Sequence, residues 1–155
     1  MLLNLTENLK LQAPGQAVWQ LLRDTERLAG LLPGVRSVER IESPDKEAYR
    51  AQVTEKVGPF KVTMKLDIAI TEMVEPSLLV ATVKGGDAVG VSRATGHIRI
   101  EVKPSEAGTL MSFGVNVEVL GKLAALGAPV IRRRVIELFS EFGRRVVAEF
   151  PVSTS

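Results

Sequence analysis

The sequence contains no cysteine, a single histidine and few aromatic side chains. Without cysteine the chain has no thiol nucleophile, no thiolate metal ligand and no disulfide framework, which suits a reducing compartment. No apolar run approaches the roughly 20 residues that a membrane-spanning helix needs. The N-terminal residues lack a basic segment followed by a long apolar run, so we expect no secretory signal. The sequence therefore predicts a cytoplasmic protein that is at most peripheral at the inner face of the membrane.

The charge balance disfavours nucleic acid as a partner. The formal net charge is +2, and aromatic residues make up 5% of the chain. A nucleic-acid-binding domain normally gathers Lys and Arg on one face and adds aromatic rings for base stacking. The aromatic residues here occupy mostly apolar positions, so we expect no nucleic-acid partner.

Catalytic and metal-binding chemistry also has little to draw on. His97 alternates in phase with Arg99 and Glu101, which places it on the wet face of a predicted strand. No pair of His or carboxylate residues has the spacing of metal ligands on a helix or hairpin. We therefore expect a surface histidine, no metal, no covalent cofactor and no catalytic residue.

Alternation of apolar and polar residues predicts seven strands, over residues 3–11, 35–42, 47–57, 60–71, 77–86, 90–102 and 109–119. Residues 13–35 instead indicate two short helices, with Pro14 near the start of the first and Asp24 or Thr25 capping the second. From about Leu123 the apolar period becomes helical and continues to Phe150, and Pro129 fits a first turn or a kink.

Six strands in succession, joined by short turns, favour an antiparallel sheet whose single apolar face must be covered. The long C-terminal helix is the only element large enough to cover it. The sequence therefore predicts one α+β domain over residues 1–150, followed by a flexible tail at 151–155.

Small residues gather on the predicted apolar side. Gly90, Ser92, Ala94 and Gly96 share the phase of the bulky residues that follow them in the strand, and Ala124 and Ala128 share the helical stripe of Ile131 and Val135. If these thin regions face each other, an apolar cavity of several hundred Å³ remains between sheet and helix. The same residues would also allow the two backbones to approach closely. The pattern leaves both interpretations open.

Two charged residues fall in apolar phase. Glu7 alternates with four leucines and would either bind a polar ligand head group or sit at a bulge or strand end with access to water. Arg132 falls inside the apolar arc of the helix and would either line a cavity mouth or extend its stem along the rim.

The arginine run of the helix has local counter-charges. Arg133–Glu137 and Glu141–Arg145 are spaced for i,i+4 pairing, and Arg134 lies three residues before Glu137. This favours a solvated, salt-bridged face over attraction to anionic lipid.

The segments VWQLLRDTERLAGLLPGV, TEKVGPFKVTMKLDIAITEM, GVSRATGHIRIEV followed by GTLMSF, and LGKLAALGAPVI occur in this order and resemble the carbon monoxide dehydrogenase CoxG family. That family belongs to the START, birch-pollen-allergen and polyketide-cyclase superfamily. The similarity covers roughly residues 1–150, and Leu32-Pro33-Gly34 and Val57-Gly58-Pro59 are its more specific parts.

The resemblance implies a helix-grip fold, in which a seven-stranded antiparallel sheet curls around the C-terminal helix and encloses an apolar cavity. It also implies a role beside molybdenum-containing carbon monoxide dehydrogenases or related hydroxylases, either in membrane recruitment or in carrying a lipophilic quinone. Some family members have a C-terminal tail thought to contact membrane. Because this chain ends at Ser155, we expect no anchor of that type.

Our first hypothesis is a non-enzymatic carrier that holds a quinone or other lipid in an apolar cavity. A small cyclase or hydrolase, using Glu7, Tyr49 or Ser92, is the second hypothesis, and an adaptor that docks the partner enzyme is the third. The predicted ligand-binding residues are Glu7, Tyr49, Phe60, Met64, Leu66, Ser92, Ala94, Met111, Phe113, Ala128, Ile131, Arg132 and Val135.

Overall fold

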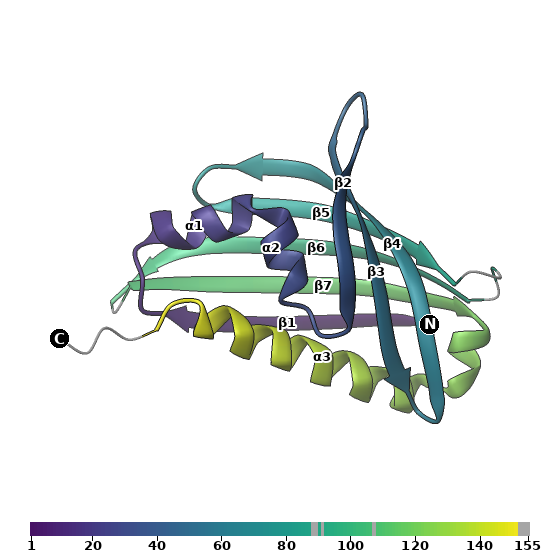
Figure 1. Cartoon of the computed structure of the whole chain (residues 1–155). Helices are drawn as coiled ribbons and strands as arrows, with labels where there is room; N and C mark the ends of the chain where they lie inside the picture. The colour runs from purple at the N-terminus through teal and green to yellow at the C-terminus, as the bar shows by residue number, and fades with distance from the viewer. Residues whose placement is uncertain (88–89, 91, 107, 152–155) are drawn as a thin grey trace.

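A computed structural model describes residues 1–87, 90, 92–106 and 108–151 (Figure 1). In chain order the elements are β1 (Leu2–Leu11), α1 (Gly15–Arg23), α2 (Thr25–Gly30), β2 (Val35–Ile41), β3 (Glu47–Val57), β4 (Phe60–Val74), β5 (Leu78–Gly86), β6 (Ser92–Ser105), β7 (Gly108–Gly121), the 3₁₀ helix η1 (Lys122–Leu126) and α3 (Ala128–Ala148). No helix in the described ranges is both long and apolar enough to cross a bilayer. The predicted tail at 152–155 and Val91 of the predicted sixth strand lie outside these ranges.

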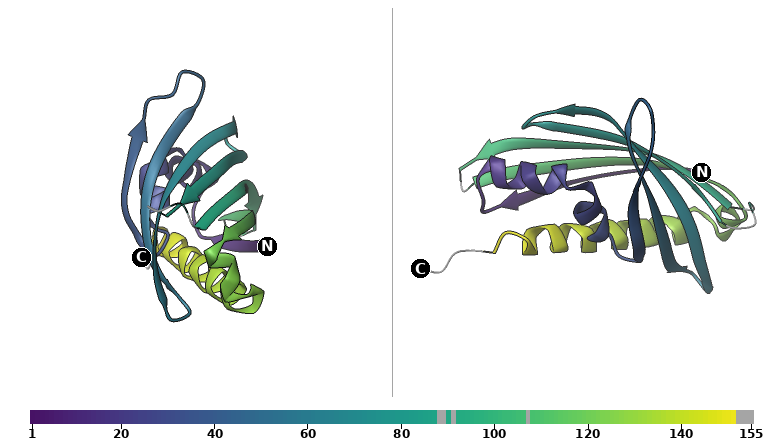
Figure 2. Two further views of the ribbon diagram at one scale, coloured as in Figure 1. Left: turned by 90° about the vertical axis from the view of Figure 1, so that its right-hand side faces the viewer. Right: turned by 45° about the horizontal axis from the view of Figure 1, so that its top comes forward.

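The seven strands form one antiparallel sheet in the order β1-β7-β6-β5-β4-β3-β2. Consecutive strands from β2 to β7 are neighbours because each is joined to the next by a short connection, and β1 completes the sheet beside β7. The sheet is strongly curved, and all three α-helices lie on its concave side (Figure 2). The predicted antiparallel sheet, the two helices after β1 and the long C-terminal helix are thus confirmed.

The helix ends are set by local chemistry. The Asp24 carboxylate caps α2 by accepting a hydrogen bond from the backbone N–H of Arg27 at 3.3 Å, as predicted. The C-terminal helix does not run from Leu123, and this prediction was wrong. Gly127, with a φ of 93°, separates η1 from α3, and Pro129 then occupies the first turn of α3, where no N–H donor is needed.

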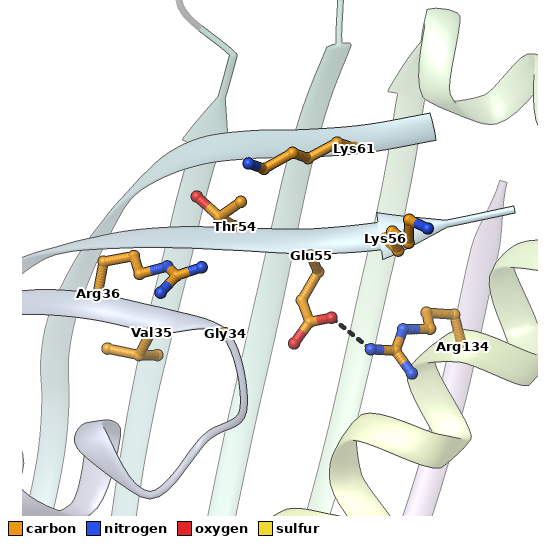
Figure 3. Close-up of a pocket in the computed structure, with 8 residues that line it drawn as sticks. All are labelled: Gly34, Val35, Arg36, Thr54, Glu55, Lys56, Lys61 and Arg134. Atoms are coloured by element: carbon orange, nitrogen blue, oxygen red, sulfur yellow. Dashed lines mark hydrogen bonds and ion pairs between the residues drawn. The ribbon is translucent and has the colours of Figure 1, made fainter. Parts of the chain in front are cut away.

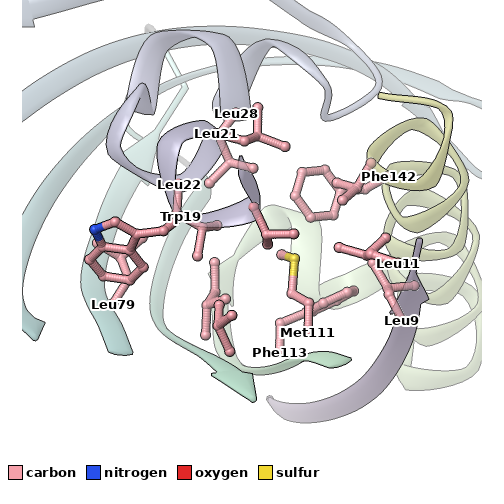
Figure 4. Packing of buried hydrophobic residues seen from close by; sticks show 14 of the residues in the cluster. Leu9, Leu11, Trp19, Leu21, Leu22, Leu28, Leu79, Met111, Phe113 and Phe142 are labelled. Carbon is pink, nitrogen blue, oxygen red and sulfur yellow. The ribbon is translucent and has the colours of Figure 1, made fainter. Parts of the chain in front are cut away.

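Helix α3 lies along the open side of the curved sheet, where it contacts the edge strand β1 on one side and β3 on the other. Its apolar stripe contributes to two separate groups of buried side chains. The first core surrounds α1, α2 and the C-terminal half of α3; its buried members are Leu9, Leu11, Val18, Trp19, Leu21, Leu22, Leu28, Leu79, Ile100, Val102, Met111, Phe113, Val115, Phe142 and Val146 (Figure 4). The second core lies at the N-terminal half of α3, and its buried members are Leu3, Val57, Val119 and Ile131.

Three phenylalanines join the sheet to α3 within the first core. The ring of Phe113 on β7 lies 5.6 Å from that of Phe142 and 6.0 Å from that of Phe139, measured between centroids. Phe142 meets Phe113 edge to face, the arrangement that aromatic quadrupoles favour. These contacts fix the C-terminal half of α3 against β7.

Tyr49 lies on the concave side of β3 and is 5% exposed. Burial is the main cause that raises its pKa above the ordinary value of 10.0, because the charged phenolate loses its hydration. The nearby Thr25 hydroxyl opposes the shift, and the Glu47 carboxylate adds to it. The phenol therefore stays protonated at physiological pH.

Replacing Phe113 with alanine should lower the free energy of unfolding by about 3–5 kcal/mol, because a fully buried ring is removed and a cavity remains. Urea unfolding followed through the fluorescence of Trp19, the single tryptophan, measures this change. Val147→Ala is the matched control on α3, since Val147 is 42% exposed, and should change stability by less than about 0.5 kcal/mol. Equal effects of the two variants would contradict the packing described for Phe113.

The absorbance of the phenolate reports Tyr49 alone, because the chain has one tyrosine. We expect a titration midpoint above 10.0 in the native protein and near 10 in denaturant. Between those two pKa values the unfolded chain loses the proton first, so the stability present below pH 10 falls as pH rises. Tyr49→Phe should abolish this part of the alkaline loss. A native midpoint at or below 10 would show that the phenol is not desolvated.

Candidate functional site

The middle of the concave face, between the two cores, is only partly covered. Met64, Leu66 and Ile68 on β4 share this face with the buried Ala51 and Tyr49, their neighbours on β3. All three β4 side chains remain half-buried, as do Val83 on β5 and Ala94 on β6. Apolar side chains on the inner face of a sheet are normally buried, so this stretch keeps apolar surface available for contact with a guest.

The small residues of this region serve mainly close packing. A Cβ atom at Gly85 would collide with the Leu66 side chain, so Leu66 fills the space above that glycine. On α3, a Cβ atom at Gly143 would lie 3.1 Å from Cδ2 of Leu9 and 3.3 Å from Oε1 of Glu7. Of the two interpretations of the small residues, close approach is therefore correct at these glycines.

An apolar cavity of about 120 Å³ lies where α3 meets β1. We call it the α3–β1 cavity; it is lined by Leu3, Asn4, Leu5, Thr6, Val115, Val117, Arg132, Val135 and Ile136. Arg132 and Val135 thus meet at one cavity, as predicted, and the side chain of Arg132 is exposed at its rim. The volume is well below the several hundred Å³ expected from the sequence, because neighbouring side chains fill part of the space.

A larger groove, of about 620 Å³, lies on the other side of α3 (Figure 3). This α3–β3 groove is lined by Gly34, Val35, Arg36, Thr54, Glu55, Lys56, Lys61 and Arg134. Its side chains come from the start of β2, the end of β3, the start of β4 and the first half of α3. The groove is predominantly polar and basic, unlike the α3–β1 cavity.

An ion pair between Glu55 and Arg134 connects β3 to α3 across this groove. Arg134 also donates to Glu137 at 2.9 Å. The hydrogen bond from Arg134 to Glu55 is the main cause that raises the pKa of the Arg134 guanidinium, which therefore stays charged. The Nε atom of Arg134 is buried, and no acceptor for it occurs among the described residues. The pair holds α3 to β3 by charge, whereas β1 is held by apolar contact.

The predicted ligand-binding residues separate into several environments. Met111, Phe113 and Ile131 are fully buried core residues that fix α3 to the sheet. Met64, Leu66 and Ala94 lie on the half-buried middle of the concave face. The latter three are therefore the predicted residues that remain accessible to a guest.

Two predicted wall residues are not interior. Phe60 is 52% exposed at the start of β4, and Ala128 is exposed at the first residue of α3. Both have the right phase, but each lies beyond the region where sheet and helix face one another. Their placement in an interior wall was wrong for this reason.

The predicted polar residues have structural partners or positions. The buried Ser92 hydroxyl accepts a hydrogen bond from the backbone N–H of Leu123 at 3.1 Å, which joins β6 to η1. Glu7 is half-buried on the concave side and faces Gly143 of α3. His97 is exposed on the outer face. Among the residues described, no three His, Asp or Glu side chains gather as metal ligands would.

Sequence reasoning missed the α3–β3 groove entirely. One signal was available: Glu55 lies in phase with Val53 and Val57, so alternation places a carboxylate on the concave face, as it does for Glu7. The helical pattern assigned Arg134 a partner on its own helix, Glu137, and that pair is confirmed. Its second partner, Glu55, is 79 residues away in sequence and depends on how α3 crosses the sheet.

Comparison with solved structures establishes the fold family. A conserved protein from Geobacillus kaustophilus superposes with a TM-score of 0.80 at 23% identity, covering 97% of this chain and 95% of that one. A START superfamily protein from Mycobacterium smegmatis gives 0.69 at 13% identity, covering 96% of both chains. The Zhui aromatase/cyclase from Streptomyces sp. R1128 gives 0.66 at 15% identity, covering 96% and 93%. The chain therefore has the START-like helix-grip fold.

The sequence itself matches one family. No curated protein matches the chain. Residues 8–148, which span β1 through the end of α3, match the carbon monoxide dehydrogenase CoxG family. The match covers most of the chain and includes both short helices, the whole of β2–β7 and α3. The chain belongs to the carbon monoxide dehydrogenase CoxG family.

Proposed function

We propose that this protein is a non-enzymatic carrier, which binds a lipophilic small molecule and serves a carbon monoxide dehydrogenase. The observation that carries the proposal is the half-buried apolar stretch of the concave face, formed by Met64, Leu66, Ile68, Val83 and Ala94 between the two cores. The family and the START-like fold support the same function. A quinone or another lipid with a flat or branched apolar body fits this chemistry.

Binding such a guest requires side-chain movement. The α3–β1 cavity, at about 120 Å³, is smaller than the roughly 300 Å³ at which ligand pockets begin. Leu66 covers Gly85, and Met64 lies two residues before it on the same face, so both flexible side chains stand where a guest would lie. We infer that a guest displaces them and widens the space beneath α3.

The partner we propose is a molybdenum-containing carbon monoxide dehydrogenase or a related hydroxylase. Membership of the CoxG family supports the association with carbon monoxide dehydrogenase. An adaptor that only docks the enzyme would also bind it, but would need no guest. Carrier and adaptor are therefore distinguished by whether a guest is bound and whether it reaches the enzyme.

A cyclase of the same superfamily is the alternative, favoured by the similarity to the Zhui aromatase/cyclase and by the carboxylate of Glu7 on the concave side. Turnover of a polyketide-like substrate that Glu7→Gln abolishes would replace the carrier proposal. The hydroxyl of Ser92, already bonded to Leu123, is a poor candidate for such chemistry.

Replacing Ala94 with phenylalanine should weaken guest binding by roughly tenfold or more, because the ring would occupy the half-buried middle of the concave face. Native mass spectrometry after mixing with a short-chain quinone measures occupancy. Thr95→Phe is the matched control, since Thr95 is the next residue of β6 and its side chain points to the opposite face. Trp19 fluorescence and thermal unfolding verify that both variants fold.

Two results would contradict the carrier. One is a wild-type protein that binds no quinone or lipid analogue. The other is equal loss of binding in Ala94→Phe and Thr95→Phe, which would show that the guest does not lie on the concave face. Co-purification with a molybdenum hydroxylase in the absence of guest binding would favour the adaptor.

A further inference from the structure

The α3–β3 groove combines four cations with one carboxylate. Arg36, Lys56, Lys61 and Arg134 line it together with Glu55, which leaves three positive charges, four less one. Arg134 already neutralises Glu55. Among the described residues, Arg36, Lys56 and Lys61 have no carboxylate within salt-bridge distance. The groove therefore has an excess of positive charge that the chain itself does not balance.

The position of the two lysines makes this excess unusual. Lys56 on β3 and Lys61 on β4 are direct partners in the strand register. Like charges placed directly opposite each other destabilise an antiparallel pair. Two positions further along the strands, Thr54 and Thr63 join their hydroxyl oxygens at 3.1 Å, so the sheet continues regularly beside the lysines. The repulsion is therefore held in a well-formed hairpin rather than relieved by a distortion.

Arg36 and Arg134 add a second kind of donor. They approach the groove from β2 and α3, on either side of Glu55 (Figure 3). A guanidinium presents paired N–H donors that match the oxygens of phosphate, and an ammonium adds a compact point charge. The Thr54 hydroxyl lies in the same lining. Cations from three strands and one helix thus converge on a space of about 620 Å³, large enough for a phosphate ester.

We propose that the α3–β3 groove is a binding site for a phosphate-type oxyanion. Lys56, Lys61 and Arg36 supply the binding charge, and the ion pair of Glu55 with Arg134 sets how much of that charge is free. The oxyanion belongs either to a soluble phosphate ester or to the head group of a phospholipid in a bilayer. The site is distinct from the concave face that the proposed function assigns to a lipophilic guest.

Two probes distinguish these sources. Glycerol 1-phosphate is titrated against isotope-labelled protein, and the amide resonances of residues 34–36 and 54–61 are followed by NMR. Vesicles of phosphatidylcholine, with and without phosphatidylglycerol, are tested by co-sedimentation. Shifts of the groove amides with glycerol 1-phosphate identify a soluble ester as a ligand. Binding only to phosphatidylglycerol vesicles identifies the lipid head group, and either result supports the site.

The double variant Lys56→Gln/Lys61→Gln should bind the effective probe about tenfold more weakly or worse, because two of the attracting charges are lost. Its melting temperature should stay equal or rise, since the repulsion across the register is removed. Lys10→Gln/Lys46→Gln is the matched control: both lysines are exposed, lie outside the groove and lower the net charge by the same amount. We expect this control to bind within about twofold of wild type.

Glu55→Gln tests the proposal in the opposite direction. Loss of the carboxylate frees the Arg134 guanidinium and adds net positive charge, so oxyanion binding should become several-fold tighter even if the link between β3 and α3 weakens. Binding of neither probe to wild type, or equal loss in the two double-lysine variants, would overturn the proposal. Quinone occupancy, measured on the same variants, should be unchanged by Lys56→Gln/Lys61→Gln, which separates failure of this site from failure of the carrier function.

Discussion

The attachment of α3 along the open side of a strongly curved sheet is the constraint on which the rest of the structure depends. A sheet with one apolar face must bury that face, and α3 is the element long enough to do so. It meets β1 on one side and β3 on the other. Phe142 and Val146 fix its C-terminal half in the first core, and Ile131 fixes its N-terminal half in the second. The cover is therefore held at both ends, and the concave face between the cores keeps its half-buried apolar side chains.

The two sides of α3 differ because they are held by different forces. Towards β1 the helix rests on apolar side chains, and the space there is small and lined mainly by aliphatic groups. Towards β3 the contact is the ion pair of Arg134 with Glu55, and long charged side chains leave a wider groove open to water. Apolar contact weakens little with salt, whereas a partly exposed ion pair is screened. Ionic strength should therefore loosen one side of the helix more than the other.

Most of the fold could be predicted because the periods of strand and helix are local properties of the sequence. Alternation in β4 and β7 assigns each side chain to a face, and short turns between strands fix their order. The same periods do not say how far two elements overlap. Phe60 and Ala128 have interior phase but stand beyond the overlap, so they are exposed. The pair of Glu55 with Arg134 escaped prediction for a related reason, since it depends on the angle at which α3 crosses β3 rather than on either local pattern.

Close packing of the small residues is compatible with a carrier, and stability arguments favour it. An apolar void of about 300 Å³, the lower size of a ligand pocket, would cost about 7 kcal/mol at the penalty measured for engineered cavities. That is comparable with the whole stability of an ordinary domain. A protein that takes up and releases a guest avoids this cost if its own flexible side chains occupy the space between the two events. Leu66 above Gly85, with Met64 beside it, has the size and freedom to do this, while the two cores keep α3 in place. The guest then replaces side chains instead of filling a standing void, and the half-buried apolar surface of β4 is the part of the sheet where that replacement begins.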